Sequence, residues 1–146
     1  MNDAISVPAP TQDEKTMAML AHVLQIFTWW IGPLVIFVVK QDSKFVRFHA
    51  LQALLWQIAL IVFWMLGMGV WIAVIFSTVF SSIGKAAPNR APPVALFAGI
   101  GLIWLLLMAV YLSNIVFGIL FGVKAGRGEW ASYPLIGRWA RHIVKA

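Results

Sequence analysis

Three long stretches without a formally charged residue constrain this chain more than any other feature of its sequence. They cover residues 17–39, 50–84 and 94–123. A helix needs roughly 20 apolar residues to cross the hydrocarbon core of a bilayer, so each stretch is long enough to span a membrane. Hydrophobic residues make up 62% of the chain and charged residues 11%, whereas soluble domains carry about a quarter charged residues. The sequence therefore predicts an all-α fold, a polytopic transmembrane helical bundle.

The number of spans depends on the middle stretch, which holds 35 residues. As one helix it would extend roughly 50 Å, whereas a turn at Gly67 would divide it into two short spans. With three spans the Lys and Arg residues divide eight to three between the two membrane faces, and with four spans six to five. The positive-inside rule expects a strong excess on the cytoplasmic face. We therefore expect three spans, with four as the alternative.

The three-span arrangement sets the domain organisation and the orientation. The expected parts are a polar N-terminal tail (1–16), a transmembrane domain (17–126, with spans at about 17–39, 50–83 and 94–123) and a basic cytoplasmic tail (127–146). The charge distribution places the N-terminus outside and the C-terminus in the cytoplasm of a bacterium, in a multi-pass inner-membrane protein. The N-terminus lacks the basic region of a signal peptide, so we expect the first stretch to stay in the mature protein.

Two local patterns mark helix boundaries in the first uncharged stretch. Thr11 and Glu14 have the spacing of a capping box, which predicts a helix that begins near Gln12. The pair Gly32-Pro33 is expected to break or kink this helix, because proline removes a hydrogen-bond donor and clashes with the preceding turn. Both patterns indicate helical structure.

The last residues of the chain form a basic amphipathic pattern. Trp139 and Ile143 fall on one face of a helix, and the basic residues fall on another. The expected contacts with anionic lipid headgroups are Arg138, Arg141 and Lys145. A helix of this kind lies naturally in the headgroup region, so we predict a C-terminal interfacial amphipathic helix. A docking site for an acidic protein partner is the alternative.

Polar side chains inside the expected spans mark the candidate site, because helices already satisfy their own backbone groups. The residues expected to form a helix-packing network are His22, Gln25, His49, Gln52, Gln57, Asn114, Gly118 and Gly122. Gln57 and Asn114 would lie roughly 10 and 13 Å from the inner ends of the second and third spans, close enough for a hydrogen bond. The glycines would let those two helices approach. We expect structural packing rather than substrate binding, and His22 has no evident partner.

The residues that the spans lack restrict the function. The chain has no cysteine, and its five acidic residues all lie outside the expected spans. Pumps and proton-coupled carriers usually need an intramembrane carboxylate, and metal sites need clustered ligands. We therefore expect no catalytic site, no cofactor, no metal and no nucleic-acid partner. The sequence favours a non-enzymatic structural or accessory subunit that packs in the lipid bilayer against itself or against other membrane-protein subunits.

Residues in three segments also carry a resemblance to a known family. They are Gly32, Pro33, Phe48, His49, Gln52, Gly128, Glu129, Tyr133 and Pro134. Over residues 17–136 the chain resembles small bacterial membrane proteins that are grouped with a chloroplast inner-envelope protein-import component. The resemblance implies a helical membrane domain and, as an alternative function, a component of a protein-translocation or channel-like assembly. An intramembrane enzyme that uses His22 or His49 is a third interpretation.

Overall fold

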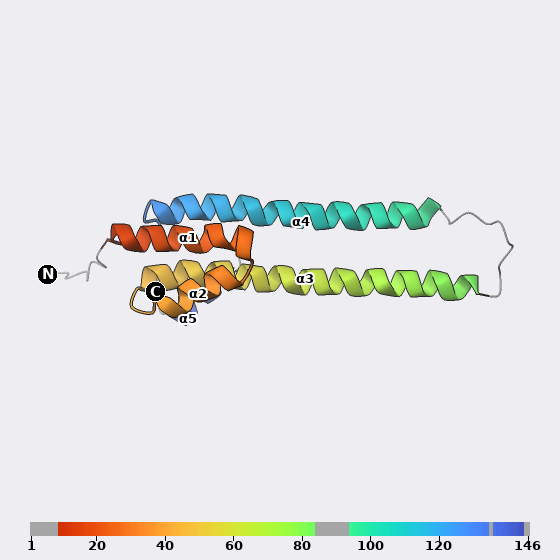
Figure 1. Ribbon diagram of the computed structural model, residues 1–146, viewed down its shortest axis with the longest axis horizontal. Coiled ribbons are helices and arrows are strands. Elements are labelled where there is room, and N and C mark those ends of the chain that lie inside the picture. The colour runs from red at the N-terminus through yellow and green to blue at the C-terminus, as the bar shows by residue number, and fades with distance from the viewer. Residues whose placement is uncertain (1–8, 84–93, 135, 145–146) are drawn as a thin grey trace. The chain divides into compact units, whose positions relative to one another are not determined.

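The computed structural model describes residues 9–83, 94–134 and 136–144, and the predicted all-α fold is confirmed. The five helices of this part of the chain are α1 (Gln12–Thr28), α2 (Ile31–Val39), α3 (Lys44–Ser82), α4 (Val94–Gly126) and α5 (Ile136–Val144) (Figure 1). They belong to two compact units. Unit 1 comprises Met1–Ile58 and Asn114–Ala146, and unit 2 comprises Ala59–Ser113.

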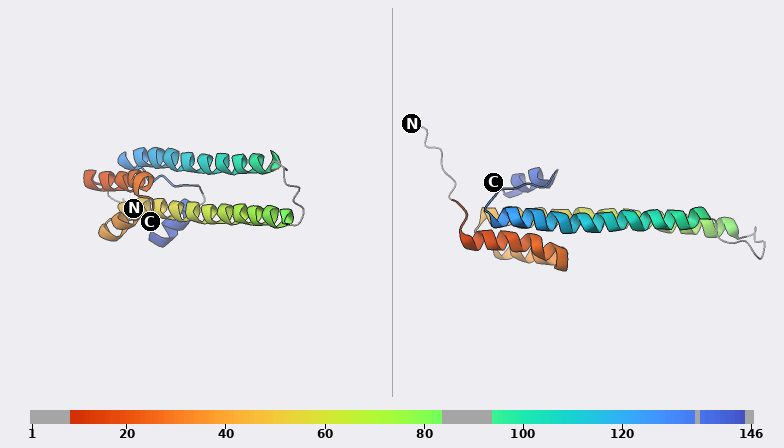
Figure 2. Two further views of the ribbon diagram at one scale, coloured as in Figure 1. Left: turned by 45° about the vertical axis from the view of Figure 1, so that its right-hand side comes forward. Right: turned by 90° about the horizontal axis from the view of Figure 1, so that it is seen from above.

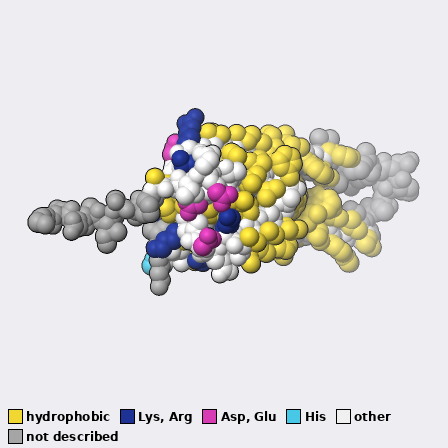
Figure 3. Space-filling model, turned by 60° about the vertical axis from the view of Figure 1, so that its left-hand side comes forward, with side chains coloured by type: hydrophobic (Ala, Val, Ile, Leu, Met, Phe, Trp, Pro, Cys, Tyr) yellow, Lys and Arg dark blue, Asp and Glu magenta, His cyan; other side chains and the backbone are white. Residues whose placement is uncertain are grey.

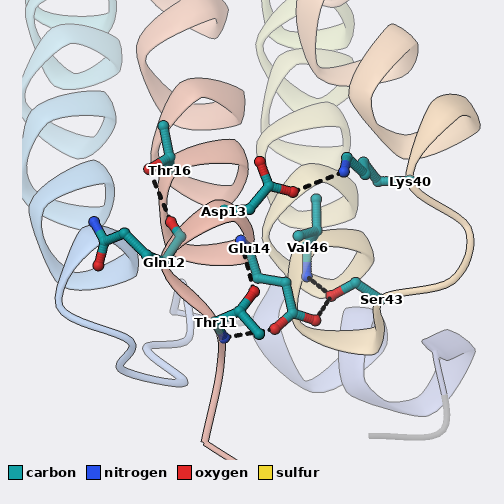
Figure 4. A network of polar contacts seen from close by, with 8 residues as sticks. All are labelled: Thr11, Gln12, Asp13, Glu14, Thr16, Lys40, Ser43 and Val46. Atoms are coloured by element: carbon teal, nitrogen blue, oxygen red, sulfur yellow. Dashed lines mark hydrogen bonds and ion pairs between the residues drawn. The ribbon is translucent and has the colours of Figure 1, made fainter.

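Helix α1 begins where the capping box predicts. The Thr11 hydroxyl accepts a hydrogen bond from the backbone N–H of Glu14 at 3.3 Å, and the Glu14 carboxylate accepts one from the N–H of Thr11 at 2.7 Å (Figure 4). These reciprocal bonds satisfy two N–H groups that the first helical turn leaves without a partner. The predicted start near Gln12 is therefore confirmed.

The first uncharged stretch reverses its direction after α1. Trp29 has a φ of 57°, a left-handed conformation that ends the helical path. The N–H of Gly32 donates to the Thr28 hydroxyl at 3.0 Å, and a Cβ at Gly32 would collide with side chains of α1, so this close approach requires glycine. Pro33 lies in the first turn of α2, where its missing N–H is not needed. The predicted break is present, and it is a reversal rather than a kink.

The two ends of this α1–α2 hairpin lie beside each other (Figures 2 and 4). Lys40 Nζ and Asp13 Oδ2 form an ion pair at 2.8 Å. The Ser43 hydroxyl donates to the Glu14 carboxylate at 2.6 Å, and this bond is the main cause that lowers the pKa of Glu14. Because the chain returns to where it started, residues 17–39 do not form the single continuous helix expected for the first span, and they are not among the candidate spans of the described residues.

Two helices in the described part of the chain are long and apolar enough to cross a membrane. They cover Lys44–Ser81 within α3 and Phe97–Gly126 within α4. α3 is continuous through Gly67, so the turn required by the four-span alternative is absent. The structure thus has two candidate spans and a helical hairpin where the sequence favoured three spans.

Small side chains let the helices of unit 1 approach one another closely. One buried cluster joins α1, α2 and α3 through Ala21, Ile36, Val46 and Ala50. A second cluster joins α1, α3 and α4 through Ala18, Phe45 and Ala125. A third cluster joins α3 and α5 through Phe48, Leu51, Ala140 and Val144. The C-terminal helix therefore packs on the beginning of α3.

Unit 2 consists of the remaining turns of α3 and α4 and has a different surface. Large hydrophobic side chains along both helices are exposed, as lipid-facing helices require. A small pocket within this unit is lined mainly by Trp64, Trp71 and Trp104. All the strongly buried polar side chains of the described residues belong to unit 1.

The hairpin changes the expected orientation of the chain. Because α1 begins, α3 begins and α4 ends at one place in unit 1, the segments before α3 and after α4 share a side. Eight of the 11 Lys and Arg residues belong to that side, where charged side chains gather beside hydrophobic ones (Figure 3). The other three, Lys85, Arg90 and Lys145, fall outside the described residues. With two candidate spans, the positive-inside rule predicts that this side faces the cytoplasm, whereas three spans predict an N-terminus outside.

The reversal predicts which positions share a membrane side. The chain has no cysteine, so Ala9→Cys, Ala87→Cys and Arg138→Cys each introduce a single site for a membrane-impermeant maleimide in sealed vesicles. We expect cysteines at 9 and 138 to react from one side and a cysteine at 87 only from the other, because α3 and α4 each cross once. Labelling of positions 9 and 138 from opposite sides would contradict the hairpin.

Candidate functional site: a buried polar network

Unit 1 buries polar side chains that come from α1, α3, α4 and the segment before α5. They are His22, Gln25, His49, Gln52, Gln57, Asn114 and Tyr133, and none is more than 5% exposed. A polar group buried without a hydrogen bond costs roughly 2–7 kcal/mol, depending on the reference state. A stable bundle must therefore provide partners for each of these groups.

The two histidines form a chain of hydrogen bonds with a single direction. His49 Nε2 lies 3.1 Å from the carbonyl oxygen of Glu129, and because a carbonyl only accepts, Nε2 carries the proton. His49 Nδ1 then accepts from His22 Nε2 at 3.0 Å. His22 Nδ1 in turn accepts from the Tyr133 hydroxyl at 3.0 Å. We infer one tautomer for each neutral ring, with all four ring nitrogens bonded.

Tyr133 lies at the centre of this network. The Gln25 amide donates to the phenol oxygen at 3.1 Å while the phenol proton points to His22. The Tyr133 ring lies 4.1 Å from the ring of Phe121 on α4, centroid to centroid. Burial is the main cause that raises the pKa of Tyr133, so the phenol stays protonated and can donate.

Gln52 attaches the segment before α5 to α3. Its amide nitrogen donates to the carbonyl of Ala131 at 3.1 Å, and its amide oxygen accepts from the N–H of Tyr133 at 2.7 Å. With the bond from His49 to Glu129, three hydrogen bonds join α3 to this backbone. We call residues 128–134 the closing segment, since it connects α4 to α5 across the network.

The hydrogen bond predicted between Gln57 and Asn114 is present. The Gln57 amide nitrogen donates to Asn114 Oδ1 at 2.9 Å and also to the carbonyl of Gln25 at 2.9 Å. α1, α3 and α4 therefore meet at one amide group.

The glycine face of α4 has a different partner from the one expected. A Cβ at Gly118 would lie 2.7 Å from the side chain of Ile26, and a Cβ at Gly122 would lie 3.5 Å from His22 Cβ. Both neighbours belong to α1, because the hairpin places this helix against α4. The glycines thus admit α1, and the expectation that they bring α3 and α4 together is wrong.

The remaining residues expected from the resemblance and from the basic C-terminal pattern lie in different surroundings. Gly128, at a φ of 85°, begins the closing segment beside Lys15, and Pro134 is exposed at its end. Arg141 donates to Ser132 and to the carbonyl of Trp130, so it is partly engaged within the protein. Arg138 is exposed, and Lys145 lies outside the described residues.

Sequence reasoning missed two contributions to this region. Tyr133 is expected from the sequence as an interfacial anchor and as part of the resemblance, whereas its hydroxyl is buried and joins residues 108 and 111 positions away in the sequence. Ser43, which bonds Glu14 and caps the first turn of α3 by accepting from the N–H of Val46, was not noted at all. A serine just before an apolar helix is the pattern that could have indicated the cap.

The described polar groups of the network bond one another within unit 1. Both ring nitrogens of His22 and of His49 have a partner, and each amide of the network bonds another helix or the closing segment. Among the described residues no group of three or more His, Asp or Glu side chains could hold a metal ion. The geometry is that of a packed core.

The bond between Gln57 and Asn114 should contribute measurable stability. We expect Gln57→Leu and Asn114→Leu each to lower the melting temperature in detergent, with a coupling of about 0.6–1.7 kcal/mol in a double-mutant cycle. Ser113→Ala is the control, because the Ser113 hydroxyl bonds only its own helix, at the carbonyl of Val110. Additive effects of the two leucine substitutions would contradict a direct bond.

We expect the Tyr133 hydroxyl to contribute to the stability of unit 1. Tyr133→Phe keeps the ring but leaves His22 Nδ1 and the Gln25 amide short of a partner, so we expect a loss of about 1–3 kcal/mol in unfolding free energy. Tyr111→Phe at a site that is 46% exposed is the matched control. Equal melting temperatures for the two variants, measured by tryptophan fluorescence, would exclude a central role for this hydroxyl.

The chain matches one protein-family model, described as the magnetosome magnetite crystal formation protein family, over residues 13–140. This range extends from the first turn of α1 into α5 and includes the whole network. No curated protein and no solved structure matches the chain. The resemblance to the family of the chloroplast import component is therefore wrong, and the channel-like role that it implied loses its basis. The chain belongs to the magnetosome magnetite crystal formation protein family.

Proposed function

We propose that this chain is a protein of the magnetosome membrane that takes part in magnetite crystal formation as a non-enzymatic structural or accessory subunit. The family match over residues 13–140 is the observation that carries the proposal. Two helices long and apolar enough to cross a membrane support a membrane-embedded protein. The sequence predicts a bacterial inner membrane as the location of the protein. The family match makes the magnetosome membrane the more specific location.

The hydrogen bonds of the buried network support a role without catalysis. A general base or a nucleophile needs a lone pair or a proton within reach of a substrate. In unit 1, His22 and His49 use both ring nitrogens to hold Tyr133, each other and the backbone of Glu129. This use of the imidazoles favours rigidity of the bundle over chemistry.

The same network suggests how the protein serves as a subunit. Hydrogen bonds with α1 and α3 hold the closing segment, and α5 packs on α3 through Ala140 and Val144. The cytoplasmic end of unit 1 is therefore a defined surface rather than a loose tail. We expect its neighbours to be lipid and other membrane-protein subunits, including further copies of this chain.

Deletion of the gene in a magnetosome-forming cell tests the proposal. We expect magnetite crystals with an altered size distribution in electron micrographs, restored by the wild-type chain, and a fluorescent fusion that co-purifies with magnetosomes. A restored chain should be detected by immunoblot at its normal level. Unchanged crystals in the deletion strain, or a fusion that stays out of magnetosomes, would overturn the proposal.

A single substitution separates a structural from a catalytic histidine. His49→Gln keeps an amide N–H that can donate to the carbonyl of Glu129 but removes the imidazole. We expect this variant, at a normal level in the membrane, to restore crystal size to the deletion strain. If the His49→Gln variant reaches its normal level but the cells keep the crystal defect of the deletion strain, the imidazole takes part in chemistry. That result would contradict the non-enzymatic role.

A further inference from the structure

Arg47 on α3 carries a hydrogen-bond donor without a partner. Its Nε is buried, and among the described residues no acceptor bonds it. The guanidinium carbon lies 5.2 Å from the centroid of the Phe37 ring on α2, a cation–π contact, and the side chain as a whole is half-buried. An arginine is charged at every physiological pH, so this guanidinium favours an anionic acceptor.

Apolar surface borders this guanidinium. Phe37 packs against the cluster that joins α3 to α5 through Ala140 and Val144, so Arg47 and α5 share a neighbour. On α5, Trp139 is 72% exposed and Ile143 is 55% exposed. The next residues of α2, Val38 and Val39, are exposed as well. A soluble anion would leave these side chains uncovered, whereas the acyl chains of a lipid would cover them.

The charge of this end of unit 1 selects the kind of lipid. Among the described residues, eight Lys and Arg residues share this side with four acidic residues, an excess of positive charge. Asp13 is already paired with Lys40, and Glu14 accepts from Ser43. A phosphodiester without a compensating cation fits this field better than a zwitterionic headgroup does.

We propose that Arg47 binds the phosphate of an anionic phospholipid whose acyl chains lie against the exposed apolar residues of α2 and α5. The guanidinium offers the N–H groups of its two terminal Nη atoms to phosphate oxygens in a fork. The site differs from the headgroup contacts expected from the sequence, because Arg141 is engaged with Ser132 and the carbonyl of Trp130. It depends on the membrane location and not on the role in magnetite formation.

The melting temperature of the full chain in detergent measures this binding. Phosphatidylglycerol should raise it by about 5 °C at saturation, since a ligand that binds only the folded state stabilises it. Phosphatidylcholine with the same acyl chains, and inorganic phosphate, should raise it by less than half as much. Arg47→Gln should lose most of the phosphatidylglycerol shift, while Arg127→Gln, at an exposed basic residue beyond α4, should keep it.

Four outcomes would overturn the site. Equal shifts with the two lipids would remove the preference for an anionic headgroup, and an equal shift with inorganic phosphate would remove the lipid. The phosphatidylglycerol shift of the melting temperature could also persist in full in Arg47→Gln, or fall equally in Arg127→Gln. Either result would indicate binding to a diffuse basic surface and not to a site at Arg47.

A second variant and a second measurement cover the case in which Arg47→Gln does not fold. Arg47→Lys keeps the charge but not the planar fork, so we expect a reduced shift, and a full shift would contradict recognition by the guanidinium. In native mass spectrometry of the unaltered chain, phosphatidylglycerol adducts should survive higher collision energies than phosphatidylcholine adducts. Equal survival would count against the proposal.

Discussion

The Tyr133 hydroxyl is the interaction on which the rest of unit 1 depends. It donates to His22 and accepts from Gln25, so a residue that follows α4 holds two turns of α1. The N–H of the same residue bonds Gln52 on α3. Because polar groups in an apolar bundle must find partners, these bonds determine which helix faces turn inward.

The direction of one hydrogen bond in this network fixes the direction of the others. The carbonyl of Glu129 can only accept, which assigns the proton on His49, then the proton on His22, and finally the donor role of Tyr133. Each group has one compatible state, and the network is complete without an ion. A histidine pair in a membrane bundle is often taken as a reactive site, but here both rings are used to join α1, α3 and the closing segment.

The α1–α2 hairpin decides the topology. A reversal at Trp29 returns the chain to its starting side, where Lys40 pairs with Asp13. This one feature gives a packed hairpin where one long helix was expected, and it places α1 against the glycine face of α4 at Gly118. It also gathers basic residues at one end of unit 1, where Arg47 and α5 share Phe37 as a neighbour.

The sequence by itself determined the helical class, the membrane environment, the capping box at Thr11 and the bond between Gln57 and Asn114. These follow from composition, local spacing and depth along a helix, which one stretch of chain suffices to establish. It did not determine the hairpin, because an uncharged stretch is equally compatible with crossing a bilayer and with turning back. The choice was made by contacts 27 to 29 residues apart, Asp13 with Lys40 and Glu14 with Ser43. The partners of His22 were likewise decided only in the tertiary structure, since no local periodicity relates His22 to Tyr133 across 111 positions.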